Sequence, residues 1–104
     1  MAGDLRDAVN SVDRVLHEPA RLLLAALLYP VEDADFLFLL QESGLTKGNL
    51  ASHLARLEEA GYLVVRKGYQ GKVPHTDYRL SAAGRAAFRS YRDQMRRTLG
   101  RLPR

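Results

Sequence analysis

The first half of the chain has the apolar spacing of short helices separated by proline and glycine. Four apolar residues near the N-terminus recur at steps of three and four and define one helix face: Leu5, Val9, Val12 and Leu16. A second helix is predicted from Pro19 to Leu28, because proline suits a first helical turn. The Tyr29-Pro30 step ends it, since the residue before a proline is disfavoured in the α conformation.

Two further helices follow, joined by a short turn. The third is predicted over residues 32–42 and opens with acids, which complement the positive end of the helix dipole. The turn is Ser43-Gly44-Leu45. Thr46 is the expected N-cap of the fourth helix, Lys47–Ala60, and Gly61 closes that helix.

The apolar period then changes from 3.6 to 2. Residues 62–67 are predicted to form a strand, 68–72 a hairpin loop, and 73–80 the return strand. Pro74 implies that the return strand is an edge or is irregular there. Ser81 is the expected cap of a last helix that continues to about Leu99.

This order of elements predicts a fold that is mainly α with a small β-hairpin, the outline of a winged helix-turn-helix. No internal repeat, low-complexity tract or linker interrupts it, so residues 1–104 are expected to form a single domain. Its expected parts are a helix at about 46–60, a wing at about 62–80 and a last helix at about 81–100.

The helix after Thr46 has two contrasting faces. Its inward stripe is Leu50, Leu54 and Leu57. Small, polar and basic residues project on the other side, with a histidine at the boundary: Gly48, Asn49, Ser52, Arg56 and His53. A helix that enters a major groove needs this mixture, because small residues allow close approach while Asn, Ser and Arg reach base edges or phosphates. An ordinary amphipathic helix with a solvated face is the alternative.

The predicted hairpin is basic. It carries five cationic or titratable basic residues and no acid before Asp77: Arg66, Lys67, Lys72, His75 and Arg79. A short hairpin tip cannot bury such groups, so they are available for phosphates or a minor groove. A plain β-ribbon kept soluble by edge lysines and arginines is the alternative.

Charge is distributed unevenly along the 104 residues, whose formal net charge is +4. Residues 1–46 contain three arginines and eight acids, whereas residues 47–104 contain thirteen lysines and arginines and four acids. This asymmetry favours a polyanionic partner for the second half of the chain.

Three segments together carry a family resemblance. They are the run 45–54 (LTKGNLASHL), the run 57–63 (LEEAGYL) and the run 78–88 (YRLSAAGRAAF). Over about residues 12–95 the chain resembles compact bacterial and archaeal winged-helix regulators related to the MarR and ArsR groups. The resemblance implies a homodimeric transcriptional regulator with a recognition helix in the major groove and a wing against the DNA backbone.

The resemblance also implies which residues contact DNA. The recognition-helix positions are Thr46, Lys47, Gly48, Asn49, Ser52, His53 and Arg56. The wing positions are Arg66, Lys67 and Lys72.

The two terminal helices are predicted to form a dimer interface. In the last helix an apolar stripe steps by three and four: Phe88, Tyr91, Met95, Leu99 and Leu102. A compact winged-helix core leaves little surface to cover this stripe, so a second copy would bury it together with the N-terminal residues Leu5, Val9 and Val12. Packing of the two terminal helices within one monomer is the alternative.

No catalytic or metal-binding motif is evident. The chain lacks cysteine, and its three histidines are far apart in sequence, so neither an enzyme, a metal site nor a cofactor is expected. The longest apolar run, residues 22–29, is eight residues, and the N-terminus lacks the pattern of a signal peptide. We therefore expect a cytoplasmic protein without a membrane segment. An effector could occupy a cleft between protomers, but no residue pattern identifies one.

Together these features predict sequence-specific binding of double-stranded DNA by a homodimeric transcriptional regulator. The alternative is a winged-helix module that binds a protein, since this fold hosts both functions. The basic second half favours DNA, and salt-sensitive binding to duplex DNA would discriminate the two.

Overall fold

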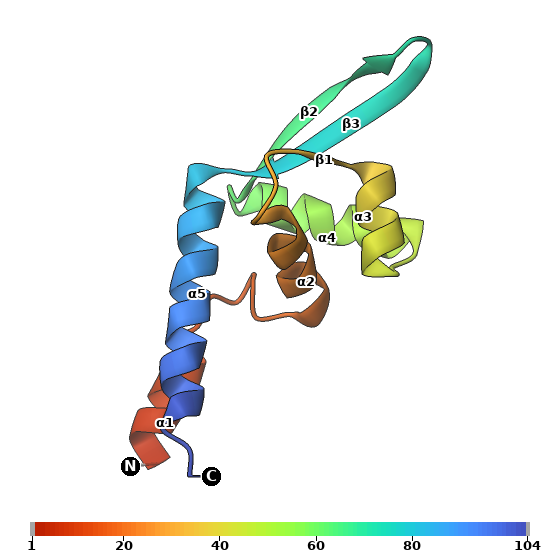
Figure 1. Ribbon diagram of the computed structural model, residues 1–104. Coiled ribbons are helices and arrows are strands. Elements are labelled where there is room, and N and C mark those ends of the chain that lie inside the picture. Colours follow the sequence, from red (N-terminus) through yellow and green to blue (C-terminus); the bar gives the residue numbers. More distant parts are fainter. Residues whose placement is uncertain (1, 104) are drawn as a thin grey trace.

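The computed structural model describes residues 2–103. The part of the chain that it describes contains five helices and three strands: α1 (Ala2–Asn10), α2 (Pro19–Leu28), β1 (Ala34–Asp35), α3 (Phe36–Ser43), α4 (Lys47–Glu59), β2 (Leu63–Gln70), β3 (Val73–Leu80) and α5 (Ala82–Gly100). The molecule is elongated, 59 × 26 × 21 Å, with the β2–β3 hairpin projecting at one end and α1 lying against the C-terminal half of α5 at the other (Figure 1). This is the predicted winged helix-turn-helix. None of the described helices is long and apolar enough to cross a membrane.

Side-chain caps set the start of four helices. The oxygen of each cap accepts a hydrogen bond from a backbone N–H of the first turn: Glu18 for α2, Asp35 for α3, Thr46 for α4 and Ser81 for α5. The predicted caps Thr46 and Ser81 are therefore confirmed. Gly44 ends α3 with a φ of 70°, which the short turn before α4 requires.

The first helix is shorter than its apolar spacing predicted. It ends at Asn10, and the carboxylate of Asp13 accepts hydrogen bonds from the N–H groups of Val15 and Leu16 at 2.8 and 3.1 Å. Asp13 thus offers the backbone a local turn in place of helix. Val12 and Leu16 still enter the core, with exposed fractions of 4% and 1%, from a non-helical segment.

The third helix also starts later than predicted. It begins at Phe36 because Ala34 and Asp35 are extended and pair with Tyr78 and Asp77 of β3. The sheet therefore has three antiparallel strands in the order β1-β3-β2. The acids before Phe36 lie in this strand and the loop before it, and Asp35 acts as a cap rather than within the helix.

The hairpin loop is shorter than the predicted 68–72. Pairing of β2 with β3 continues to Gln70 opposite Val73, so that only Gly71 and Lys72 remain in the turn. Gly71 has a φ of 64° and Lys72 does not have a positive φ, as in a type II′ turn with glycine at its first central position. Pro74 pairs with Tyr69 only, beyond the reach of β1, so it lies on a free strand edge as predicted.

The core fixes α4 against α2 and α3. Six leucines are almost completely buried: Leu16, Leu24, Leu28, Leu39, Leu50 and Leu57. Full burial of one leucine side chain contributes about 1.5–3 kcal/mol. The inward stripe predicted for α4 is therefore confirmed, and its opposite face is held toward solvent.

Candidate nucleic-acid interface

The outward face of α4 is open. Its predicted contact residues are exposed: Thr46, Lys47, Gly48, Asn49, Ser52 and Arg56. Arg56 forms a surface ion pair with Glu59 at 3.8 Å, and such exposed pairs are weak. The oxygen of Thr46 accepts from the N–H of Asn49, so the N–H groups of Lys47 and Gly48 remain at the helix start, where they suit a phosphate.

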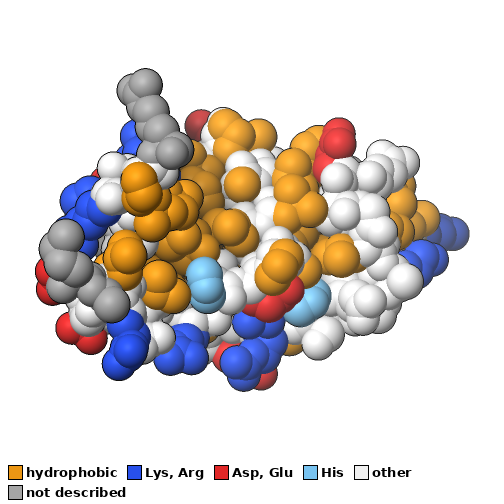
Figure 2. Space-filling model, turned by 90° about the horizontal axis from the view of Figure 1, so that it is seen from below, with side chains coloured by type: hydrophobic (Ala, Val, Ile, Leu, Met, Phe, Trp, Pro, Cys, Tyr) orange, Lys and Arg blue, Asp and Glu red, His pale blue; other side chains and the backbone are white. Residues whose placement is uncertain are grey.

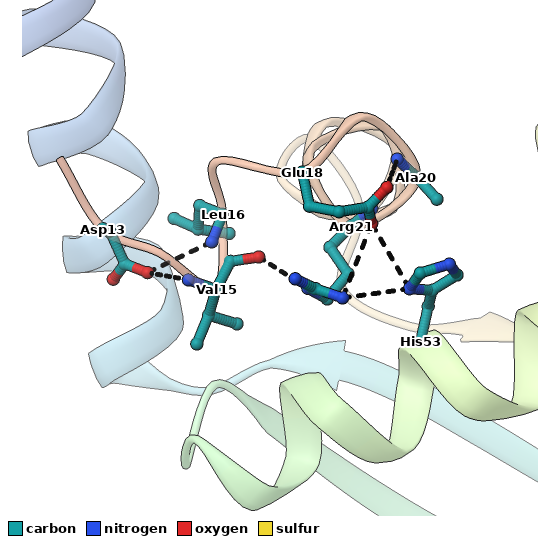
Figure 3. A network of polar contacts seen from close by, with 7 residues as sticks. All are labelled: Asp13, Val15, Leu16, Glu18, Ala20, Arg21 and His53. Carbon is teal, nitrogen blue, oxygen red and sulfur yellow. Dashed lines mark hydrogen bonds and ion pairs between the residues drawn. The ribbon is translucent and has the colours of Figure 1, made fainter. Parts of the chain in front are cut away.

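His53 is placed differently from the other predicted residues of α4. Its side chain is only 23% exposed and turns toward the start of α2, where its Nδ1 lies 3.2 Å from Nη1 of Arg21 and 3.3 Å from Oε2 of Glu18 (Figure 3). Although partial burial opposes ionisation, hydrogen bonds from the N–H groups of Ala20 and Arg21, the charge that His53 carries when its ring is protonated, and the charge of Arg21 lower the pKa of Glu18. Glu18 and Arg21 therefore belong to this side of the site.

Sequence reasoning missed this pair of residues. Glu18 had a readable signal, since it directly precedes a proline at a helix start, which is an N-cap position. Arg21 had no such signal in the sequence. It comes close to His53 only because the leucines of α2 and α4 pack together.

The wing is basic mainly toward its tip. Lys67 and Lys72 are exposed, with Lys67 opposite Thr76 and Lys72 in the turn. Arg66 is 70% exposed, but its Nη2 lies 3.4 Å from Asp77 and 4.0 Å from Asp33. His75 also contacts Asp77, at 2.9 Å. Acidic side chains thus partly neutralise the positive charge at the base of the wing. The contact with Asp33 could not be predicted, because Asp33 lies far from the hairpin in the sequence.

The wing is anchored to the end of α4. Ser81 donates its hydroxyl to the carbonyl of Gly61 at 2.6 Å and its N–H to the carbonyl of Tyr62 at 3.0 Å. The hydroxyl of Tyr62 donates to Asp13. Burial and the carboxylate of Asp13 raise the pKa of Tyr62 to about 12. These contacts fix the direction of the wing relative to α4.

The terminal helices pack together within the monomer. The amide of Gln94 on α5 donates to the carbonyl of Ala8 at 3.2 Å and to the hydroxyl of Ser11 at 2.7 Å. Val12 and Tyr91, which were predicted at a dimer interface, are already buried in one copy, with exposed fractions of 4% and 7%. They therefore have almost no surface to offer a partner.

Other residues of the predicted dimer interface do have free surface. Val9 and Leu99 are 44% and 58% exposed, and Leu102, whose N–H bonds to the carbonyl of Leu99, is 49% exposed. Leu5, Phe88 and Met95 are half-buried. Figure 2 shows apolar side chains spread across the face seen from below, including the end formed by α1 and the C-terminal part of α5.

Within residues 2–103, no group of three or more His, Asp or Glu residues is placed to hold a metal ion. In the described part of the chain, the exposed side chains that gather on α4 and the wing are basic or hydrogen-bonding.

Comparisons with known proteins agree with this geometry. The profile of the family described as winged helix DNA-binding domain matches residues 20–99. An uncharacterized protein of Methanocaldococcus jannaschii is 35% identical over 79 residues, which cover 75% of this chain and 85% of that protein.

Solved structures share this fold. A transcriptional regulator homologue from Pyrococcus horikoshii OT3 has a TM-score of 0.83 at 24% identity, over 94% of this chain and 95% of that one. The Rv0081 protein of M. tuberculosis has a TM-score of 0.69 at 27% identity, over 84% of each chain. A MarR-family regulator from Silicibacter pomeroyi shares the fold as well, with a TM-score of 0.63. The chain thus belongs to the winged helix DNA-binding domain family, with transcriptional regulators as its structural neighbours.

Proposed function

We propose that the protein is a homodimeric transcriptional regulator that binds specific sequences of double-stranded DNA. The observation that carries this proposal is the outward face of α4, where small, polar and basic side chains are exposed while the opposite leucines lock the helix to the core. A helix held in this way can enter a major groove without losing its packing.

Within α4, some residues would contact bases and others would contact phosphates. Asn49 and Arg56 have the side chains that form bidentate hydrogen bonds with adenine and guanine, and Ser52 lies between them on the same face. Thr46, Lys47 and Gly48 stand at the helix start, where close approach and free N–H groups favour a phosphate.

The wing would contact the phosphate backbone or the minor groove of the DNA. Lys67 and Lys72 carry charges that no described acid pairs with, whereas Arg66 would first have to leave Asp77 and Asp33. The two lysines are therefore the stronger phosphate contacts of the wing, and Arg66 is the weaker.

A second copy would cover the exposed apolar residues of α1 and α5. The surface rests on Val9 and Leu99, extended by the half-buried Leu5, Phe88 and Met95. A two-fold dimer holds two copies of α4 at a fixed separation, so the preferred DNA site would be pseudo-palindromic, with half-site centres about 34–36 Å apart or a multiple of this distance.

Selection of bound duplexes from a random library tests the function. We expect enrichment of a two-fold related sequence, and binding that weakens steeply as salt is added. A protein that enriches no sequence and shows no salt-sensitive binding to any duplex would favour the alternative, a module that docks a partner protein.

We propose only the chemical class of a small-molecule effector, an aromatic acid. The DNA binding of BpsR from Bordetella bronchiseptica, which shares this fold at 14% identity and a TM-score of 0.66, is regulated by 6-hydroxynicotinic acid. A pocket of about 580 Å³ at the base of the wing is lined in part by Arg79, Arg85 and Ser81, whose guanidinium and hydroxyl groups would bind the carboxylate of such an acid. Screening such acids for release of the selected duplex tests this part.

A further inference from the structure

The two ring nitrogens of His53 have different surroundings (Figure 3). Nδ1 faces Arg21 and Glu18 at the start of α2. Nε2 has no hydrogen-bond partner among residues 2–103, and no side-chain nitrogen or oxygen of this part of the chain is both buried and unpaired. Nε2 therefore reaches solvent, on the helix that carries Asn49 and Ser52.

Arg21 is held in place from two sides. Its Nε donates to the carbonyl of Val15 at 2.7 Å, and its Nη1 lies 3.6 Å from Oε2 of Glu18. The arginine side chain is only 13% exposed. Its Nη1 is thus presented to His53 at a fixed position, rather than ranging through solvent as a surface arginine does.

This placement decides which nitrogen of the neutral ring carries the proton. A guanidinium can only donate hydrogen bonds, so Nδ1 of His53 must accept from Nη1 of Arg21, and the proton resides on Nε2. Glu18 competes weakly for Nδ1, because its Oε2 lies 3.3 Å away without the alignment of a hydrogen bond, whereas Nη1 of Arg21 at 3.2 Å has it.

We propose that Arg21 is a positioning residue for DNA binding, which holds His53 as the Nε2–H tautomer and so makes it a hydrogen-bond donor to an acceptor atom of DNA. This inference rests on the proposed function. An unrestrained imidazole would present either a donor or an acceptor at Nε2, whereas phosphate oxygens and most purine edge atoms of the major groove accept.

Nitrogen-15 NMR of the imidazole rings tests the first step. We expect the neutral wild-type ring of His53 to show the Nε2–H signature, and the neutral ring in R21M to show a mixture of tautomers. R21K retains a donor and should restore the wild-type signature. His17 and His75, which contact Tyr91 and Asp77 instead, serve as internal references that neither variant moves. A His53 tautomer that is the same in R21M and wild type overturns the inference.

Titration of the selected duplex, followed by fluorescence anisotropy, tests the second step. H53Q places an amide N–H near the position of Nε2, and H53N places it near Nδ1. We expect H53Q to bind like the wild type, and H53N and R21M each to bind about three- to tenfold more weakly, the value of one hydrogen bond. R21M should have no further effect in the H53Q background, because Arg21 acts through the ring.

The outcomes separate the two proposals. If R21M weakens binding equally in the H53Q background, Arg21 has a structural role and the inference is wrong, while the proposed function stands. If the wild type binds no duplex, the proposed function fails, and the role of His53 toward DNA fails with it. Thermal unfolding of each variant shows whether weaker binding reflects a loss of fold, and R21K covers the case in which R21M does not fold.

Discussion

Gly84 of α5 lies directly against the backbone carbonyl of Tyr62. A Cβ atom at this position would come within 2.2 Å of that oxygen, a distance at which the backbone of one of the two elements must shift. Tyr62 stands between the end of α4 and the start of β2, so this contact joins the last helix to the corner from which the wing departs.

G84A is therefore expected to destabilise the fold by about 1–3 kcal/mol, measured by urea or thermal unfolding. G48A is the matched control, because a Cβ on that helical glycine meets nothing within 4 Å. G48A should not lower stability, because alanine adopts the helical conformation of this first-turn position without strain. Equal stability of G84A and the wild type would mean that α5 does not need this close approach.

The open face of α4 leads to a prediction about specificity. N49A and R56A are each expected to weaken binding to the selected duplex by about 1–3 kcal/mol and to leave binding to unrelated duplexes nearly unchanged, because base contacts carry the sequence preference. Competition titrations with the two duplexes measure this difference. Q41A, which removes an exposed amide from α3, is the control. Wild-type discrimination in both variants would show that α4 does not read the bases.

The wing predicts a different signature. The double variant K67A/K72A should weaken binding to all duplexes alike and reduce the slope of log K against log salt by about 0.9 for each phosphate that the wing no longer neutralises. R97A removes an exposed charge from α5, remote from the wing, and should leave the slope nearly unchanged. An effect of K67A/K72A on one sequence alone, at constant slope, would mean that the lysines bind to bases.

The exposed apolar end of α5 leads to a prediction about assembly. Leu99 is 58% exposed, so L99D should leave the monomer folded, shift the dimer toward monomer, and weaken binding to the selected site much more than non-specific binding. M95D, at a half-buried position, should do the same at some cost in stability. Equilibrium ultracentrifugation measures the mass. A wild-type mass near 11.7 kDa at tens of micromolar would contradict the dimer.

The contact of Tyr62 with Asp13 predicts a loss of stability in alkali. Burial and the nearby carboxylate raise the pKa of Tyr62 from 10.0 to about 12 in the folded chain. Below pH 10 the phenol is protonated in both the folded and unfolded states. Between pH 10 and 12 the unfolded chain releases this proton more readily, so stability falls as the pH rises. Urea unfolding at several pH values should show a smaller fall for Y62F than for the wild type, whereas Y69F, at a residue 74% exposed, should follow the wild type.

Local patterns in the sequence predicted most of this fold. The leucine spacing of α4, the caps Thr46 and Ser81 and the change of period after Gly61 each depend on neighbours within a few residues. The predictions were wrong where residues that are distant in the sequence determine the local structure. Asp13 redirects the chain after α1, and β3 recruits Ala34 and Asp35 as a third strand, although about forty residues separate them.

The candidate site shows the same division. The exposed residues of α4 follow from helical periodicity, because the buried leucines determine the opposite face. Helical periodicity does not predict the partners of His53 and Arg66. Arg21 contacts His53, and Asp33 contacts Arg66, only because of tertiary packing.

The third strand supports only the base of the wing. β1 pairs with β3 at Asp77 and Tyr78, so the ribbon from Lys67 to Thr76 has one hydrogen-bonded neighbour per strand and its backbone amides face solvent on both edges. Isolated two-stranded ribbons are marginally stable in water, and amide hydrogen exchange should be fastest in this part of the sheet. A ribbon that fluctuates when free must lose conformational entropy when it grips a phosphate backbone. In the proposed complex, the affinity of the wing for DNA would therefore depend on its stiffness as well as on its charge.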